Sequence, residues 1–188
     1  MPNYCSNALT ITGPNIESVL TAIKGDETFK EEVVIDDNDP LSALPYYKAH
    51  CKVLSKDGST TTYINEHVVY LDAKKILPVP EGLSVEENHN WRVDHWGSKC
   101  VYPDRQSLER YLESATICFT TAWNPPYLLI QKLSAMFPSY KFTIKSSNPR
   151  PEKVTFENGH LTRYWAWSPT YKFDANGKRV QINKTEEI

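Results

Sequence analysis

A short tract of histidines, tryptophans and charged residues is the first place where this chain could do chemistry. It holds His89, Trp91, Asp94, His95 and Trp96. Asp94 and His95 are neighbours in sequence and so point apart, whereas an acid–base pair needs the carboxylate to reach the imidazole through space. A metal held by His89 and His95 would need a third ligand, and no HExxH or Cys/His set accompanies them. We therefore expect Trp91, His95 and Trp96 to serve packing, with ligand contact as the alternative and catalysis less favoured.

Trp123 opens a second candidate site, because it precedes Asn124, Pro125 and Pro126. Paired prolines after an asparagine are typical of a helix start, and the free amides of a helix start can bind an anion. The two prolines lack an amide, which weakens that use. We expect Asn124 to cap the helix and Trp123 to cover the sheet, with a ligand contact at Trp123 as the alternative.

Basic and aromatic residues alternate near the C-terminus, at Arg163, Tyr164, Trp165 and Trp167. Exposed rings flanked by cations can stack on bases and pair with phosphates. On a strand, Arg163, Trp165 and Trp167 share one face and Tyr164 lies on the other. Three interpretations stay open: a face that covers the core, a protein contact, or a site for a nucleotide or nucleic acid.

An acidic stretch covers residues 26–39, where seven carboxylates accompany one cation, Lys30. Asp36, Asp37 and Asp39 stand at its end, after the apolar residues 33–35. The apolar interruption favours an edge strand over a disordered tail. The acidic residues form either a solvated loop or a surface for a basic partner, in the second case imitating the phosphates of nucleic acid.

Composition restricts the class of protein. The formal net charge is −2, so no overall field draws the chain to nucleic acid or to an anionic membrane. The charge is uneven, with 13 basic and 18 acidic residues in 1–144 (net −5) against 8 basic and 5 acidic in 145–188 (net +3). That asymmetry indicates a surface role more than a reaction.

The cysteines and the apolar runs point to a reducing compartment. Cys5, Cys51, Cys100 and Cys118 form no CxxC pair, so we expect no metal site and no cofactor. No apolar run reaches the roughly 20 residues of a membrane span, and the first residues lack the pattern of a secretory signal. We therefore expect a cytoplasmic protein that does not contact a membrane, and the sequence does not fix its oligomeric state.

Two β-α units frame the chain. Residues 5–12 alternate as a strand, and Asn15 is expected to cap a helix that carries Ile16, Val19, Leu20 and Ile23 and that ends at Gly25. Residues 115–121 are predicted as a strand, followed by an apolar helix up to Pro138 and by an alternating strand at 140–144. With a meander between the units, this gives the βαββαβ order of an α+β, ferredoxin-like fold with an antiparallel sheet and two main helices.

The remaining segments are additions to that core. A long insertion or meander at 26–87 is expected to hold a hairpin of 51–54 with 60–64 and an extended run at 76–80. Asp104 is expected to cap a short helix with Leu108, Tyr111 and Leu112. A C-terminal extension at 148–188 is expected to turn at Asn158-Gly159 and again at Asn176-Gly177. We expect residues 1–188 to form a single domain.

Three stretches carry a family resemblance: MPNYCSNALTITGP, NWRVDHWGSK and FTTAWNPPYLLIQKLSAMFPSYKFTI. They resemble the YubB-like ferredoxin-like family, small proteins carried mainly by bacterial plasmids and bacteriophages. The chain departs from the family at Cys100, where a tryptophan is usual, and in the more basic hairpin that follows residues 146–151. The resemblance implies a ferredoxin-like domain that serves a mobile element inside a bacterium. It supplies no catalytic residue and implies no iron–sulfur cluster.

These observations lead to an expected function and two alternatives. We expect a non-enzymatic accessory protein of a bacteriophage or plasmid that binds a host bacterial protein, in the role of an inhibitor of a defence system. The first alternative is a binder of nucleotide or single-stranded nucleic acid that uses the aromatic and basic C-terminal hairpin. An enzyme with a site in residues 89–96 is the least favoured reading.

Overall fold

The computed structural model describes residues 3–26, 28–36, 38, 52–147, 150–173 and 179–187. Its main sheet contains β1 (Tyr4–Thr12), β5 (Val101–Arg110), β6 (Ser114–Ala122), β7 (Lys141–Ser146), β8 (Glu152–Glu157), β9 (His160–Phe173) and β10 (Arg179–Glu187). A smaller sheet contains β2 (Phe29–Asp36), β3 (Lys52–Asp57) and β4 (Thr60–His67). The helices are α1 (Ile16–Ile23), α3 (Ala73–Ile76), α4 (Val85–Trp96) and α5 (Tyr127–Met136).

The main sheet has seven antiparallel strands in the order β10-β9-β8-β7-β1-β6-β5. Within it, β1, α1, β5, β6, α5 and β7 follow one another as βαββαβ, and their strands lie in the order β7-β1-β6-β5. This is the ferredoxin-like arrangement that the sequence predicts. The middle strands of the motif are β5 and β6. β6 is the strand predicted at 115–121, whereas β5 takes the place of the strand that we expected from a meander within 26–87, and that expectation is wrong.

Alternation along each strand gives the main sheet two different faces. One row of paired residues is apolar, and it runs through Ile117, Leu9, Ile144 and Val154, all of which are buried. The helices cover this face, and Leu129 of α5 is fully buried in the same core. Because successive side chains of a strand point to opposite sides, the intervening residues form a second face on the side away from the core. We call this second side the open face.

Residues 101–110 form a strand, so the helix that we expect after Asp104 is wrong. Leu108 pairs with Ile117 and packs against the core, whereas Leu112 lies in the following turn with 98% of its surface exposed. The apolar residues here therefore share no helical stripe. β5 is the last strand of the sheet and its register shifts between Val101 and Gln106, and an edge with such a shift tolerates Pro103.

The sequence reading assigned no helix to residues 85–96, yet α4 begins there with a complete capping box. The Ser84 hydroxyl accepts a hydrogen bond of 3.3 Å from the Glu87 amide, and the Glu87 carboxylate accepts one of 2.9 Å from the Ser84 amide. The bonds that Ser84 donates lower the pKa of Glu87 below its ordinary value. α4 ends at Gly97, whose φ of 82° is left-handed.

The predicted caps of the two main helices are corrected. Asn15 stands at the N-cap of α1 but makes no side-chain capping bond. α5 begins at Tyr127, so the cap that we expect from Asn124 is absent, and Pro126 takes the N-cap position. After α1, Gly25 is needed for a close approach, since a Cβ on it would lie 2.9 Å from the Val69 Cβ.

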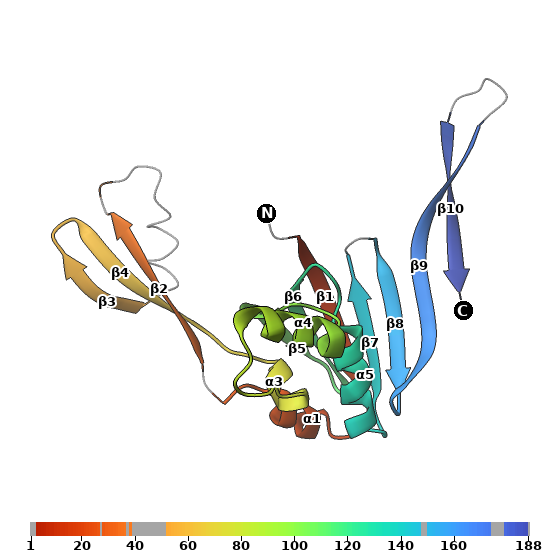
Figure 1. Cartoon of the computed structure of the whole chain (residues 1–188), viewed down its shortest axis with the longest axis horizontal. Coiled ribbons are helices and arrows are strands. Elements are labelled where there is room, and N and C mark those ends of the chain that lie inside the picture. Colours follow the sequence, from red (N-terminus) through yellow and green to blue (C-terminus); the bar gives the residue numbers. More distant parts are fainter. Residues whose placement is uncertain are drawn as a thin grey trace.

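The insertion forms the three-stranded sheet β2-β4-β3, which stands away from the helices at the left of Figure 1. The predicted hairpin is β3 and β4, and the predicted edge strand is β2, so both predictions are confirmed. Ile76 belongs to α3, so the prediction of extended backbone at 76–80 is wrong at Ile76, whereas Leu77 is extended with φ −148° and ψ 95°. No helix in the described ranges is long and apolar enough to cross a membrane.

The C-terminal extension continues the main sheet beyond β7, through β8, β9 and β10. The predicted turn at Asn158-Gly159 is confirmed, because both residues have positive φ, 50° and 76°, as a two-residue hairpin requires. β9 pairs with β10 over its C-terminal part, and this hairpin reaches past the body of the molecule at the upper right of Figure 1. The second predicted turn, at Asn176-Gly177, lies outside the described residues.

Candidate functional site

The open face of the main sheet is floored by threonines. Thr116, Thr10, Thr143 and Thr155 stand opposite one another on four successive strands, and Arg163 of β9 stands opposite Thr155. The hydroxyls of Thr10 and Thr116 lie 3.1 Å apart, and those of Thr143 and Thr155 lie 3.2 Å apart. The row is therefore neutral and polar in the middle of the sheet and cationic at β9.

The neighbouring row adds two lysines and a tryptophan. Lys145 stands opposite Ala8 on one side and Lys153 on the other, and Lys153 stands opposite Trp165. Both lysines are exposed, and Trp165 is half-buried. Over β7, β8 and β9 these residues line a shallow groove of about 1050 Å³.

The groove carries an excess of positive charge. Lys141, Lys145, Lys153 and Arg163 line it, and Glu152 is the one carboxylate among its lining residues. Neighbouring strands lie roughly 4.8 Å apart, so the paired cations are close enough to act together on one ligand. We call this surface the basic groove.

Glu152 is held by a network that ties α5 to β8 and β9. Its carboxylate accepts hydrogen bonds from the Tyr127 hydroxyl (2.7 Å), the Tyr164 hydroxyl (3.2 Å) and the Arg150 guanidinium (3.1 Å). Burial raises the pKa of Tyr127 well above its ordinary value; the hydrogen bond with Ser146 lowers it and the bond to Glu152 raises it further. The network fixes the edge of the basic groove and occupies its carboxylate.

The tryptophans of the 89–96 tract lie on α4 and face the core. Trp96 is 3% exposed and donates a hydrogen bond of 3.0 Å from its Nε1 to the Leu77 carbonyl. Trp91 stacks on His95 with ring centroids 4.2 Å apart and meets Trp96 edge to face. His95 is exposed, and its Nδ1 lies 2.8 Å from the Trp91 carbonyl oxygen. The geometry brings these three residues together as packing of α4.

A second cleft, of about 510 Å³, lies beside this helix and is lined in part by Trp96, Arg92 and Cys100. The Arg92 guanidinium lies 5.3 Å from the Trp96 ring. Burial raises the pKa of the Cys100 thiol, while the charge of Arg92 opposes that shift. The thiol is therefore a weak nucleophile at neutral pH.

Trp123 lies apart from the basic groove, in the residues that follow β6. It has a left-handed φ of 72°, its amide donates to the Asn3 carbonyl (2.7 Å), and 47% of its surface is exposed. The Lys99 amine lies 5.4 Å from its ring. Trp123 therefore presents an exposed ring at the end of the sheet where β1 begins.

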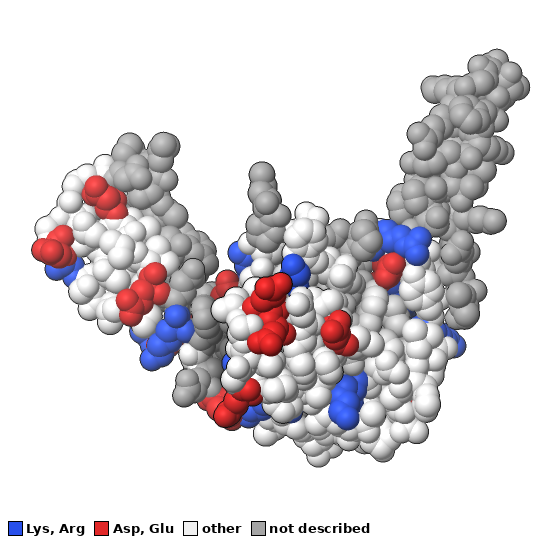
Figure 2. Space-filling view, viewed as in Figure 1, with Lys and Arg blue, Asp and Glu red and all other residues white. Residues whose placement is uncertain are grey.

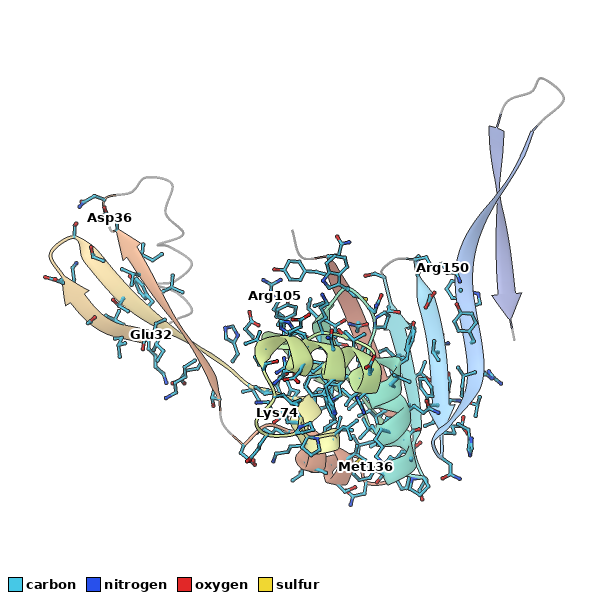
Figure 3. The ribbon with its side chains drawn as sticks, viewed as in Figure 1. Glu32, Asp36, Lys74, Arg105, Met136 and Arg150 are labelled. Carbon is cyan, nitrogen blue, oxygen red and sulfur yellow. The ribbon has the colours of Figure 1, made fainter. Side chains whose placement is uncertain are left out.

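The remaining candidate residues belong to the insertion and to the C-terminal extension. Asp36 is exposed at the end of β2, far from the main sheet in Figure 3, while Asp37 and Asp39 lie outside the described residues. Trp167 lies on β9, and nothing is described of its side chain. Of the predicted site residues whose side chains the structure describes, Arg163 and Trp165 line the basic groove.

Sequence reasoning missed the lysines of the basic groove. Lys141, Thr143 and Lys145 alternate with the buried Phe142 and Ile144, so the pattern that predicts the strand also places the cations on its outer face. Pairing with Lys153 depends on the order of strands in the sheet, which periodicity alone does not give. The side of the molecule seen in Figure 2 is different, because acidic and basic side chains are interspersed over it.

Comparison with known proteins supports the fold. Residues 101–186 match the family model described as "Ferredoxin-like domain in Api92-like protein". The chain is also similar to the crystal structure of a protein Api92 from Yersinia pseudotuberculosis, with a TM-score of 0.53 and 13% identity over 86% of this chain and 96% of that chain. No curated protein matches the chain. At this identity the likeness bears on the fold alone.

Proposed function

We propose that the protein is a non-enzymatic binding protein that holds single-stranded nucleic acid on the open face of its main sheet. The observation that supports this proposal most is the basic groove, which Lys145, Lys153 and Arg163 line together with the half-buried Trp165. Cations track a phosphate backbone and a tryptophan offers a stacking surface to any base, which together favour binding without sequence preference.

The floor of the groove suits an extended polar ligand. Thr10 and Thr143 line it with half-buried hydroxyls, which both donate and accept hydrogen bonds, whereas Thr155 is buried. The aromatic residues among the described lining of the groove are Tyr164 and Trp165, and Tyr164 packs against the core, so stacking falls to Trp165 on β9. The ligand would thus contact the sheet through its backbone over β7 and β8 and through a base at β9.

The state of Glu152 favours binding over catalysis. Among the described residues that line the groove it is the one carboxylate, and a guanidinium and two phenol hydroxyls already hold it. A general base needs a free lone pair aimed at the reacting proton. The groove residues therefore supply charge and shape without an acid–base pair.

A titration tests the proposal. Fluorescein-labelled oligothymidylate is added to the full chain at low and at physiological salt, and anisotropy reports binding. We expect binding at low salt whose logarithmic affinity falls linearly with the logarithm of salt concentration. Binding that does not change with salt, or no binding at low salt, contradicts it.

A second function, binding of a host bacterial protein by an accessory protein of a bacteriophage or plasmid, rests on the insertion. Its edge strands expose Val34, Val53 and Leu54, each with more than half of its surface accessible, close to the acidic Glu32 and Asp36. Exposed aliphatic side chains on edge strands favour a protein contact. The family resemblance supports a role for a mobile element inside a bacterium, and inhibition of a defence system is the form of that role that we propose.

The second function has its own experiment. The tagged chain and a Val34→Asp/Leu54→Asp variant are used to capture proteins from a bacterial lysate, with Leu112→Asp, at another exposed leucine, as the matched control. A partner retained by the chain and by the control but lost from the double variant supports it. Recovery of the same proteins by all three contradicts it.

A further inference from the structure

A cluster of two tyrosines and an arginine occupies the end of the open face where β1 begins. Tyr4 pairs with Ala122 and precedes the fully buried Cys5, so its side chain points away from the core, and 44% of its surface is exposed. Its ring centroid lies 5.5 Å from that of Tyr102, with the planes at 67°. Both rings therefore belong to the same side of the sheet as the basic groove.

Arg105 joins the two rings. Its guanidinium carbon lies 4.4 Å from the centroid of Tyr4 and 5.4 Å from that of Tyr102. Asp104 lies 3.5 Å from the Arg105 Nε and orients the guanidinium further. The arginine keeps 45% of its side-chain surface exposed, and Figure 3 shows it on the main body of the molecule, away from the insertion. We call Tyr4, Tyr102 and Arg105 the tyrosine cluster.

The tyrosine cluster and the basic groove are connected by small polar residues. Ser6 pairs with Thr120 between the row of Tyr4 and the row of Ala8, and Ala8 stands opposite Lys145. From Tyr4 to Ala8 the strand rises about 13 Å, and from β1 to β9 the sheet extends about 14 Å, using a rise of roughly 3.3 Å per residue and a strand spacing of roughly 4.8 Å. A ligand that touches Tyr4 and Trp165 must therefore cover about 20 Å.

We propose that the tyrosine cluster is a second contact point for single-stranded nucleic acid, so that one extended strand lies across the open face from Trp165 to Tyr4. A base would stack on the exposed face of Tyr4, while Arg105 would pair with an adjacent phosphate. This inference rests on the proposed function of the basic groove and adds the length and the path of the ligand.

The surface between the two contact points favours nucleic acid over a protein. The centre of a protein interface is usually apolar and depleted of charge. Here the connecting residues are Ser6, Thr120 and Lys145, two of them hydroxyl side chains and the third a cation. Aromatic and cationic contacts at both ends of a polar strip fit a chain of bases and phosphates.

Length dependence separates this inference from the proposed function. Labelled oligothymidylates of roughly 4, 8 and 16 nucleotides, the range that single binding domains cover, are titrated at constant salt. We expect the affinity to rise with length. Tyr4→Ala and Arg105→Gln should weaken binding of the longest oligomer at least about fivefold and leave the shortest one unchanged.

Matched variants keep the test sharp. Tyr4→Phe retains the ring and is expected to keep the affinity for the longest oligomer. Tyr111→Ala removes an exposed tyrosine that lies beyond the far end of β5 and is expected to have no effect. Thermal unfolding confirms that each variant is folded, and Arg105→Gln carries the test if Tyr4→Ala is not folded.

The outcomes differ for the two claims. If the longest oligomer binds but Tyr4→Ala and Arg105→Gln change nothing, the tyrosine cluster has no part and the basic groove stands. If both variants weaken all lengths equally, they act on the groove itself and the extended path is wrong. If no oligomer of any length binds, both claims are overturned.

Discussion

Arg163 and Tyr164 are consecutive on β9 and serve opposite faces of the main sheet. The Tyr164 side chain packs against the core, and its hydroxyl donates a hydrogen bond of 3.2 Å to Glu152. Arg163 stands opposite Thr155 and lines the basic groove. One strand thus both closes the core and presents a cation. This division makes Arg163 a place where binding can be changed without touching the core.

Arg163→Ala is expected to weaken binding of single-stranded nucleic acid and to reduce the slope of logarithmic affinity against logarithmic salt by about 0.7. The reason is the loss of one phosphate contact. Lys132→Ala is the control, because it removes an exposed cation from α5, on the other side of the sheet. Equal slopes for the chain and the Arg163 variant would rule out this contact.

Trp165→Ala is expected to lower the affinity by about 1–3 kcal/mol, the contribution of one stacked base, with the salt slope retained. Trp91→Ala, which removes a half-buried tryptophan stacked on His95 of α4, should leave binding intact. Anisotropy titration of both variants with labelled oligothymidylate measures the two affinities. The same loss in both would mean that instability, and not stacking, causes it.

Because of Tyr127, we expect the folded protein to lose stability in alkali. Burial raises its pKa, so the folded state favours the neutral phenol more than the unfolded state does. The stabilisation is full below the unfolded pKa of about 10 and is lost as pH rises toward the folded value. In urea unfolding from pH 8 to pH 11, the free energy of unfolding of the chain should fall more steeply above pH 10 than that of Tyr127→Phe. Parallel curves would contradict the assignment.

Gly97→Ala is expected to reduce the free energy of unfolding by about 1–2 kcal/mol, because its φ of 82° is left-handed. An added Cβ would lie 3.4 Å from the Pro125 carbonyl oxygen and the Tyr127 amide, which is an ordinary van der Waals contact, so the backbone conformation is the expected cause of the loss. Gly82→Ala is the control, since its φ of 79° is similar and its Cβ would meet nothing within 4 Å. Gly82→Ala should lose a similar amount, and urea unfolding that shows no loss for Gly97→Ala would contradict backbone strain at this position.

Periodicity predicted the elements whose two faces differ sharply. The strand that contains Leu9 and the turn at Asn158-Gly159 were predicted because burial alternates there and because the turn needs two positive φ values. β5 escaped prediction, since an edge strand that contains Pro103 and a register shift has weak alternation. α4 has a weak apolar stripe, although Ser84 and Glu87 already carried its capping signal.

The residues of the candidate site were also predicted only in part. Arg163 and Trp165 were recognised because they are adjacent in sequence to other aromatic residues. Lys145 and Tyr4 were missed, since their importance comes from strand order. The sheet places β7 between β1 and β8, and it brings Tyr102 to Tyr4 across β6. Such neighbours depend on topology, which local patterns do not encode.

The central claim is that the basic groove binds phosphates. Its most direct test is the salt dependence of oligothymidylate affinity for the chain and for the variant Lys145→Ala/Lys153→Ala/Arg163→Ala, with Lys132→Ala as the control. Each phosphate contact on a single strand contributes about −0.7 to the slope, so the triple variant should flatten it by about 2. A triple variant with the slope of the control would contradict the account.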